Sequence, residues 1–393
     1  MVPKILTALE EVLGKTEKPI GLHEPWLTSS EQEAVMKCVA SGWVSSVGPE
    51  VTRFEERLAA LFEVRFAVAM VNGTAALHLA LELSGVLPND EVIVPSLTFV
   101  ATANAVSHCG AIPHFVDSET TTLGMCPLQL ESHLQQVAEI RNGSTYNRET
   151  GRRISALMPV HLFGHAAQID KLAAIAQRWN LPLVEDAAEA LGTLYKGKAC
   201  GSFGSLAGTS FNGNKIITTG GGGAILTNDE SLAKRAKHLS TTAKLPHPWA
   251  FVHDQVAYNY RLPNLNAAMG CAQLDKLPLI LKNKKILAEK YRNVFSGVSQ
   301  TTFFLQTKDC ESTYWLNTLI LPPNDGSLRD EVLSAAHSKG YLLRPLWQPI
   351  HTLPMYQTAP RGDLSVAEDL ARRVINLPSS PQLIAEGEGL LVE

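Results

Sequence analysis

The sequence predicts an α/β protein with a large, mainly parallel sheet domain followed by a smaller α+β domain. Short continuous apolar runs, typical of strands buried on both faces, alternate with helical segments over roughly the first 270 residues. After about Leu274, charged helical segments predominate. The chain has 393 residues, enough for two domains. We therefore expect an N-terminal arm and large domain over residues 1–270, and a small C-terminal domain over residues 271–393.

The predicted strands of the large domain are apolar runs of four to six residues bounded by turn or polar residues. They cover residues 66–71, 91–95, 111–116, 155–160, 181–184, 205–210 and 223–227. Helices are predicted between them at residues 75–83, 99–108 and 168–179, the first with Thr74 as a plausible N-cap. This alternation is the basis for expecting parallel strands joined by helices.

The predicted small domain contains a charged helix over residues 276–292, a strand over residues 313–321 and a helix over residues 330–339. In the large domain, the polar stretch 141–148 is expected to form an exposed loop. Charged side chains interrupt residues 1–19, which favours a short amphipathic helix over a signal peptide. No stretch is apolar enough to span a bilayer.

Charge and cysteine content narrow the function classes. The formal net charge is −4, and the 34 Lys and Arg residues are scattered, so we expect no nucleic-acid partner and no binding to an anionic membrane. The six cysteines lie far apart, without a CxxC pair or zinc-site spacing, so no metal site is expected. Free thiols at this low density predict a cytoplasmic protein.

The segment from Ser210 to Gly223 holds the most informative residue of the chain. It places Lys215 between a predicted strand and a run of four glycines, and Asp186 ends another predicted strand 24 residues before Ser210. Open α/β sheets bind ligands at strand ends of this kind. A recessed amine, an acid and a glycine-rich backbone together match the needs of pyridoxal phosphate (PLP).

Each of the two charged groups has a specific expected role. Lys215 would form a Schiff base with the cofactor aldehyde and, once released, move a proton between carbon and nitrogen. Asp186 would bind the pyridinium nitrogen and keep the ring protonated. Taken singly, Lys215 is better explained as a surface lysine, and Asp186 as a solvated carboxylate or a helix N-cap.

Other candidates are weaker when taken alone. The helix start at Gly73, Thr74 and Ala75 would hold a phosphate, assisted by the Ser210 hydroxyl, although an ordinary strand–helix turn has the same appearance. Phe99 would stack on a flat ring, or else be a core aromatic residue.

His161 follows a predicted strand and would contact cofactor or substrate, or else be a hydrogen-bonded strand-end histidine. The run from Gly220 to Gly223 lacks the Gly-Lys-Ser/Thr of a Walker A loop, so a turn with close backbone approach is expected there.

The order of these segments resembles the DegT/DnrJ/StrS group of sugar aminotransferases, which share the fold type I aminotransferase fold. The resemblance runs from about Pro19 to Pro381. It is carried by Asn72-Gly-Thr-Ala-Ala-Leu77, Pro95-Ser-Leu-Thr-Phe-Val-Ala-Thr-Ala-Asn104, Pro159-Val-His-Leu-Phe-Gly164, Glu185-Asp-Ala-Ala-Glu-Ala190, residues 210–223, and Tyr258-Asn-Tyr-Arg-Leu262.

The resemblance implies roles for these residues. Lys215 is implied to be the Schiff-base lysine, and Phe99 the ring that stacks on the cofactor. The other implied cofactor contacts are Gly73, Thr74, Ala75, Asp186, Glu189 and Ser210. Asn259 is implied to reach the phosphate of a neighbouring subunit, which predicts a homodimer with shared active sites.

Two departures and four further segments point to a subgroup. Many members of the family carry Gln where this chain has Glu189, and Glu where it has Gly221. The segments 22–25, 41–48, 314–317 and 344–351 resemble C4 aminotransferases that act on UDP-4-keto-6-deoxy-N-acetylglucosamine with glutamate as amino donor. The substrate contacts expected on this basis are His161, Trp315, Arg344 and His351.

Alternative functions remain open at this point. The closest is a perosamine-forming C4 aminotransferase acting on GDP-4-keto-6-deoxymannose. A non-catalytic sensor with the same fold need not keep Lys215, Asp186 and Phe99 together. A related 3-dehydratase would carry His in place of Lys215, and a nucleotide-sugar oxidoreductase would carry a Gly-x-Gly-x-x-Gly after an early strand, which is absent.

Overall fold

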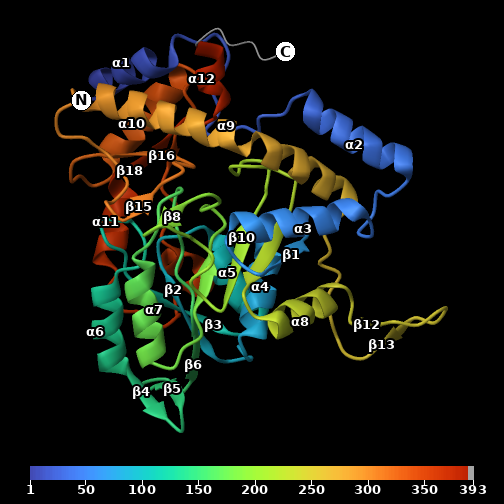
Figure 1. Ribbon diagram of the computed structural model, residues 1–393. Coiled ribbons are helices and arrows are strands. Elements are labelled where there is room, and N and C mark those ends of the chain that lie inside the picture. The colour runs from blue at the N-terminus through green and yellow to red at the C-terminus, as the bar shows by residue number, and fades with distance from the viewer. Residues whose placement is uncertain (388–393) are drawn as a thin grey trace.

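The computed structural model describes residues 1–387, in which a long helix, α9 (Asn264–Phe295), connects a large α/β part to a smaller α+β part (Figure 1). The predicted helix over residues 276–292 lies within α9. Pro278 lies inside this helix. The predicted domain boundary after residue 270 falls inside α9, and this helix packs against both parts. The division into two domains stays a prediction.

The central sheet of the large part is built from two hydrogen-bonded groups of strands. The groups meet through parallel bridges between Leu157 and Leu183 and between Val160 and Asp186. The strand order is β1 (Phe66–Met70), β11 (Gly223–Thr227), β10 (Leu206–Ser210), β7 (Val184–Asp186), β6 (Arg153–Leu157), β2 (Glu91–Pro95) and β3 (Ile112–Val116). Of these, only β11 runs antiparallel to its neighbours. The predicted mainly parallel sheet is confirmed.

The helices that surround this sheet are α3 (Pro49–Leu61), α4 (Gly73–Leu83), α5 (Val100–His108), α6 (Pro127–Val137), α7 (Ile169–Arg178) and α8 (Glu230–Ser240). Of these, α4 and α5 begin within a few residues of the ends of β1 and β2. Helix α2 (Ser29–Ser41) packs on α9 instead. The turn from β1 into α4 is short because Asn72 is the N-cap: its Oδ1 accepts a hydrogen bond from the Ala75 N–H at 2.8 Å. This cap fixes the start of α4 directly above the carboxyl end of β1.

The smaller part contains an antiparallel sheet in the order β14 (Thr302–Phe303), β16 (Asn317–Ile320), β18 (Val374–Leu377) and β17 (Arg344–Pro345). Helices α10 (Ser327–Ser338), α11 (Ser365–Arg373) and α12 (Gln382–Gly387), with the 3₁₀ turns η1 (Ile350–Thr352) and η2 (Pro354–Tyr356), complete it. The N-terminal helix α1 (Val2–Leu13) also packs here: Ile5 and Leu9 share an apolar cluster with Tyr291 and Val332. The predicted amphipathic helix near the N-terminus is thus confirmed.

Two hairpins extend from the large part (Figure 1). Strands β4 (Ala138–Arg141) and β5 (Ser144–Asn147) form one of them, so the prediction of an exposed loop at residues 141–148 is wrong. The segment is ordered because β5 also pairs with β6 and buries Thr145 and Asn147. The other hairpin, β12 (Lys244–Leu245) with β13 (Val252–His253), exposes Trp249 and Phe251.

The remaining short strands are β8 (Leu194–Tyr195), β9 (Lys198–Ala199) and β15 (Cys310–Glu311), which form a small sheet of their own. All six cysteines are free. Within residues 1–387, no helix combines the length and the apolar character that crossing a bilayer requires.

Candidate active site

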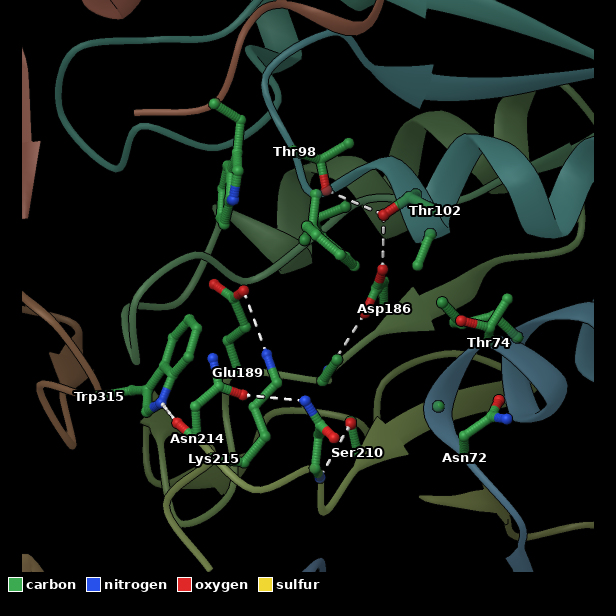
Figure 2. A pocket seen from close by; sticks show the side chains of 18 of the residues that line it. Asn72, Thr74, Thr98, Thr102, Asp186, Glu189, Ser210, Asn214, Lys215 and Trp315 are labelled. Atoms are coloured by element: carbon green, nitrogen blue, oxygen red, sulfur yellow. Dashed lines mark hydrogen bonds and ion pairs between the residues drawn. The ribbon is translucent and has the colours of Figure 1, made fainter. Parts of the chain in front are cut away.

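A cavity of about 330 Å³ lies at the carboxyl ends of β1, β7 and β10, which is where open α/β sheets bind ligands. Most of the residues expected to contact cofactor or substrate line it. They are Gly73, Thr74, Phe99, Asp186, Glu189, Ser210, Lys215 and Trp315. Figure 2 shows Lys215, Glu189 and Trp315 together on one side of this cavity, with Asn72 and Thr74 on the other.

Lys215 follows β10 in a tight turn, in which its N–H donates to the Asn212 carbonyl at 3.0 Å. Its side chain is only 13% exposed, and its Nζ lies 3.3 Å from Glu189 Oε1. The same Nζ lies 3.9 Å from the centre of the Trp315 ring, a cation–π distance. The Lys215 amine is therefore held between an acid and an aromatic face, pointing into the cavity.

Glu189 is buried behind Lys215, and its Oε2 accepts a hydrogen bond from the Phe163 N–H at 3.0 Å. Burial raises the pKa of Glu189, although the charge of Lys215 and the Phe163 hydrogen bond oppose this rise. The carboxyl group of Glu189 therefore binds a proton more tightly than an ordinary glutamate does, and it lies within ion-pairing distance of the Lys215 amine.

Asp186 stands at the end of β7, on the floor of the cavity. Its Oδ2 accepts a hydrogen bond from Thr102 Oγ1 at 2.7 Å, and its Oδ1 accepts from the Ala188 N–H at 3.1 Å. Thr102 is in turn 2.8 Å from Thr98. Burial raises the pKa of Asp186 and outweighs these hydrogen bonds. A buried carboxylate of this kind favours a cationic partner, such as a protonated ring nitrogen.

The start of α4 and the end of β10 approach each other closely on the side of the cavity that faces Trp315 and Lys215. A Cβ atom placed on Gly73 would lie 2.8 Å from Ser210 Cβ, so only glycine fits there without displacement. Gly73, Thr74 and Ser210 all line the cavity, and a helix N-terminus is a natural anion site. Ala75 does not line the cavity, and its N–H is already bonded to Asn72.

The residues that line the cavity fit PLP. The cofactor has an aldehyde, a ring nitrogen and a phosphate, and the cavity offers an amine at Lys215, a buried acid at Asp186 and a helix start beside Ser210. The unfavourable burial of the Asp186 charge is the feature that a cationic pyridine ring would relieve. The donor set therefore fits the cofactor at each of its three ends.

Aromatic side chains form much of the remaining wall. Phe99 precedes α5, is 52% exposed and lies 6.3 Å from Trp347, measured between ring centres. The Trp315 indole N–H donates to the Asn214 carbonyl at 2.7 Å, which fixes the ring over Lys215. Trp347 lies within the segment 344–351 that carried part of the resemblance, but it was not singled out from the sequence.

Two further residues that line the cavity were not predicted, although simple features of the sequence could have identified them. Thr102 lies three residues after Phe99, one helical turn away, and therefore on the same face of the first turn of α5. Ala188 lies two residues after Asp186 and is one of the small residues of the Glu185-Asp-Ala-Ala-Glu-Ala190 segment.

The structure does not bring every predicted residue to the cavity. His161 is fully buried elsewhere: its Nε2 lies 3.0 Å from Glu185 Oε2, and its Nδ1 accepts from the Ala167 N–H at 3.1 Å. His351 is also buried, with its Nδ1 2.7 Å from Ser96 Oγ and its Nε2 3.1 Å from a carboxylate of α11.

Arg344 is exposed on β17, outside the cavity lining. Asn259 is exposed as well, and its Oδ1 accepts a hydrogen bond from Arg261 Nε at 2.8 Å. The expected contacts of these four residues with substrate or with a second subunit stay predictions.

Comparison with known proteins agrees with this geometry. Residues 25–388 match the sequence profile of the DegT/DnrJ/EryC1/StrS aminotransferase family. The GDP-perosamine synthase of Escherichia coli O157:H7 is 37% identical over 369 residues, which cover 94% of this chain and 95% of that protein.

Solved structures show the same fold. The aminotransferase TlmJ from Streptoalloteichus hindustanus superposes with a TM-score of 0.83 at 28% identity, covering 92% of this chain and 93% of TlmJ. Spr1654 from Streptococcus pneumoniae, solved in a PLP form, gives a TM-score of 0.82 at 25% identity, covering 92% and 93% of the two chains. The predicted fold type I aminotransferase fold and PLP cofactor are confirmed. The chain therefore belongs to the DegT/DnrJ/EryC1/StrS aminotransferase family and is a PLP-dependent sugar aminotransferase.

Proposed function

We propose that this protein transfers the amino group of glutamate to the C4 ketone of a nucleotide-linked 4-keto-6-deoxy sugar. The observation that carries the proposal is the convergence of Lys215, Asp186 and the start of α4 on a single cavity. An amine that moves protons, an acid for the ring nitrogen and an anion site are the groups that transamination requires of the protein.

Each group has a defined task. PLP, when bound, supplies the electron sink that allows a proton to leave the carbon next to the substrate nitrogen. Lys215 Nζ takes that proton and returns it, since it is the basic group that projects into the cavity beside Glu189. Asp186 holds the ring nitrogen, and Gly73, Thr74 and Ser210 hold the phosphate. Phe99 covers the face of the ring.

Glutamate and the sugar use the same cavity in turn, so we expect ping-pong kinetics. Two observations support the C4 position and the 6-deoxy sugar: the segments that resemble C4 aminotransferases, and the 37% identity to a GDP-perosamine synthase. The segments 22–25, 41–48, 314–317 and 344–351 favour a UDP-linked 2-acetamido-2,6-dideoxy-4-keto-hexose, whereas the perosamine synthase favours GDP-4-keto-6-deoxymannose. Our primary candidate is the UDP-linked acetamido sugar, with the GDP-linked sugar as the second.

We further propose that the active form is a homodimer in which Asn259 of one subunit completes the phosphate site of the other. Two features support this. Asn259 is exposed and is not among the residues that line the cavity of its own subunit. The adjacent hairpin region exposes Trp249 to 83%, Phe251 to 81% and Val256 to 94%, and exposed apolar side chains gathered in this way are typical of a protein interface.

The decisive experiment is a substrate panel. The purified protein, loaded with PLP and glutamate, is offered the UDP-, GDP- and dTDP-linked 4-keto-6-deoxy sugars, and the products are identified by NMR. We expect a 4-amino sugar from the UDP-linked acetamido substrate with the highest kcat/KM. Preference for the GDP-linked sugar would establish the second candidate, and amination at C3 or absence of amination of all three would refute the proposed C4 activity.

A further inference from the structure

Two tyrosines, Tyr258 and Tyr260, flank Asn259 in the chain, and the catalytic groups do not explain them. Their rings stack on each other, with ring centres 4.6 Å apart and ring planes inclined by 12°. The Tyr258 N–H donates to the Leu239 carbonyl at 2.9 Å, near the end of α8. The Tyr260 carbonyl accepts a hydrogen bond from the Val71 N–H at 2.8 Å, directly after β1. The backbone on both sides of Asn259 is therefore fixed to the large part of the protein.

Both tyrosine side chains lie against helix α4, the helix whose start lines the cavity. The Tyr258 hydroxyl donates to Glu82 Oε2 at 2.7 Å, and the Tyr260 hydroxyl lies 3.2 Å from His78 Nδ1. The edge of the His78 ring also meets both tyrosine rings, at centre distances of 5.1 and 5.9 Å. Because His78 and Glu82 are four residues apart, they share one face of α4. We call these four residues the tyrosine clasp.

The clasp determines the direction in which Asn259 points. Antiparallel bridges at Asn259 and Arg261 show that the backbone is extended there, and neighbouring side chains of an extended chain lie on opposite sides. With Tyr258 and Tyr260 turned toward α4, Asn259 faces the other way. Arg261 lies there too, and its Nε donates to Asn259 Oδ1 at 2.8 Å. Because the Oδ1 end of the amide accepts this bond, the NH₂ end of Asn259 is the one that can donate to an anion.

We propose that the tyrosine clasp is a positioning device for the active site of the partner subunit, because it holds Asn259 in the orientation that reaches the partner's cofactor phosphate. The inference rests on the proposed function, since it requires the homodimer in which Asn259 completes the neighbouring site. Tyr258 and Tyr260 act through Asn259 and contact neither substrate nor cofactor. Helix α4 then serves two sites: its start binds the phosphate of its own subunit, and its later turns hold the segment that serves the partner.

The competing explanation is that the clasp steadies only the cavity of its own subunit. The Tyr260 carbonyl binds the Val71 N–H, and Val71 directly precedes Asn72, the N-cap of α4. The two explanations differ in which of the two active sites a substitution in the clasp damages. A dimer whose two chains carry different substitutions therefore separates them.

The experiment uses a hybrid dimer with one working site. The first chain carries Lys215→Ala and supplies Asn259, and the second chain keeps Lys215 and carries Asn259→Ala. If the sites are shared, the single site with both residues intact lies in the second chain and uses Asn259 of the first. The two chains carry different affinity tags, so that only the hybrid is purified. The readout is the PLP concentration that gives half-maximal conversion of the cofactor by glutamate, followed by absorbance, because this half-reaction does not depend on the identity of the sugar.

Substitutions of Tyr258 are then placed in one chain at a time. In the first chain, Tyr258→Leu should raise the half-maximal PLP concentration by about tenfold, because a hydrogen bond to the phosphate is lost. Tyr258→Phe should raise it less, because the ring keeps its contacts with Tyr260 and His78 and also preserves the packing. In the second chain, neither substitution should change this concentration by more than about twofold, since the asparagine that it would position is already absent.

Tyr195 provides a matched control. Its hydroxyl also donates to a carboxylate, Asp170 Oδ1, at 2.8 Å, but Tyr195 is not among the residues that line the cavity. Tyr195→Phe in either chain should therefore leave the PLP dependence of the hybrid unchanged.

Three results would overturn the inference. Damage from the second chain alone would show that the clasp supports the cavity of its own subunit. Equal damage from both chains would assign Tyr258 to the stability of the fold. No effect of either substitution in either chain would show that Asn259 keeps its orientation without the clasp. In all three cases the hybrid without a Tyr258 substitution is active; a hybrid no more active than the Asn259→Ala homodimer would instead refute the shared site itself, and with it both proposals.

Discussion

Lys215 Nζ lies 3.3 Å from Glu189 Oε1, and this pair joins the ends of two adjacent parallel strands, β10 and β7. Both side chains line the cavity, and the Glu189 carboxyl group is buried to 4% exposure, so the acid lies beside the reacting amine in surroundings that admit little water.

Replacement of Lys215 by Ala should abolish turnover. The amine is expected both to bind the cofactor covalently and to move the proton, so its loss should lower kcat by about 10³-fold or more. The assay measures amino transfer from glutamate to the nucleotide sugar. Reduction of the PLP-loaded protein with borohydride, followed by mass spectrometry, should attach the cofactor to wild type but not to Lys215→Ala.

Lys196 offers the control for this experiment, because it is an exposed lysine that is also paired with an acid, Asp170, at 2.6 Å. Lys196→Ala should keep both the turnover and the covalent attachment. Retained transamination in Lys215→Ala would refute the assignment of the catalytic lysine.

Replacement of Asp186 by Asn should lower activity while raising the stability of the cofactor-free protein at neutral pH. Loss of a charged hydrogen bond to the ring nitrogen should reduce kcat by roughly 10- to 100-fold. Burial raises the pKa of Asp186 above its ordinary value of 3.8, so the folded chain holds this proton more tightly than the unfolded chain does. Ionisation of Asp186 therefore destabilises the fold as the pH rises from 3.8 through the raised pKa.

Thermal unfolding at a series of pH values tests whether ionisation of Asp186 destabilises the fold. The Tm of cofactor-free Asp186→Asn minus that of wild type should be positive and should grow with pH in that range. Asp170 is a control for which we expect the opposite change. Burial raises the pKa of Asp170, but hydrogen bonds from Lys196 and Tyr195 outweigh burial and lower this pKa overall. Asp170→Asn should therefore become less stable than wild type as the pH rises. If the Tm difference for Asp186→Asn were negative or did not change with pH, the ionised Asp186 carboxylate would not destabilise the cofactor-free fold.

Replacement of Gly73 by Ala should weaken cofactor binding. The new Cβ would lie 2.8 Å from Ser210 Cβ, so Ser210 or the start of α4 has to move, and both belong to the proposed phosphate site. Overpacking of this kind costs roughly 1–3 kcal/mol, so the Kd for PLP should rise by about tenfold. Absorbance titration of the cofactor-free protein measures this Kd.

Gly221 is a matched glycine from the same region. A Cβ at Gly221 meets no atom within 4 Å, and its backbone is outside the left-handed region, so Gly221→Ala should bind PLP as wild type does. Equal affinities for Gly73→Ala and wild type would argue that the phosphate binds elsewhere.

The strand ends were predictable from the sequence because apolar runs stop at turn residues, and this placed Asp186, Ser210 and Lys215 at one edge of the sheet. The face that each residue presents was harder to predict. Neighbouring residues of an extended chain point to opposite sides. Val160 lines the cavity, so His161 beside it points away and meets Glu185. Nothing in the local sequence indicates which of these two neighbours faces the ligand.

Segments that depend on distant partners were also hard to predict. Residues 141–148 are polar enough to suggest a loop, yet residues 138–147 form a hairpin, and β5 of this hairpin also pairs with β6. Helix α9 begins twelve residues before the predicted helix at Lys276, because its first half is buried and rich in small residues while only the second half shows the charged pattern that marks an exposed face. Tyr258 and Tyr260 were noticed only as part of a segment, since their contacts with α4 are visible only in the folded chain.

Hybrid dimers test whether the active sites are shared. If Asn259 serves the neighbouring subunit, a dimer of one Lys215→Ala chain and one Asn259→Ala chain contains one site with both residues intact and one site with neither. Two different affinity tags on coexpressed chains allow this hybrid to be purified. We expect about half of the wild-type activity, well above that of either variant homodimer.

The alternative arrangement gives a different result. If Asn259 acted on its own subunit's cavity, every site of the hybrid would lack one of the two residues, and the hybrid would be no more active than the Asn259→Ala homodimer. Full activity of the Asn259→Ala homodimer would remove Asn259 from the phosphate site altogether. The exposed position of Asn259, with its Oδ1 accepting a hydrogen bond from Arg261 rather than facing its own cavity, leads us to expect the first outcome.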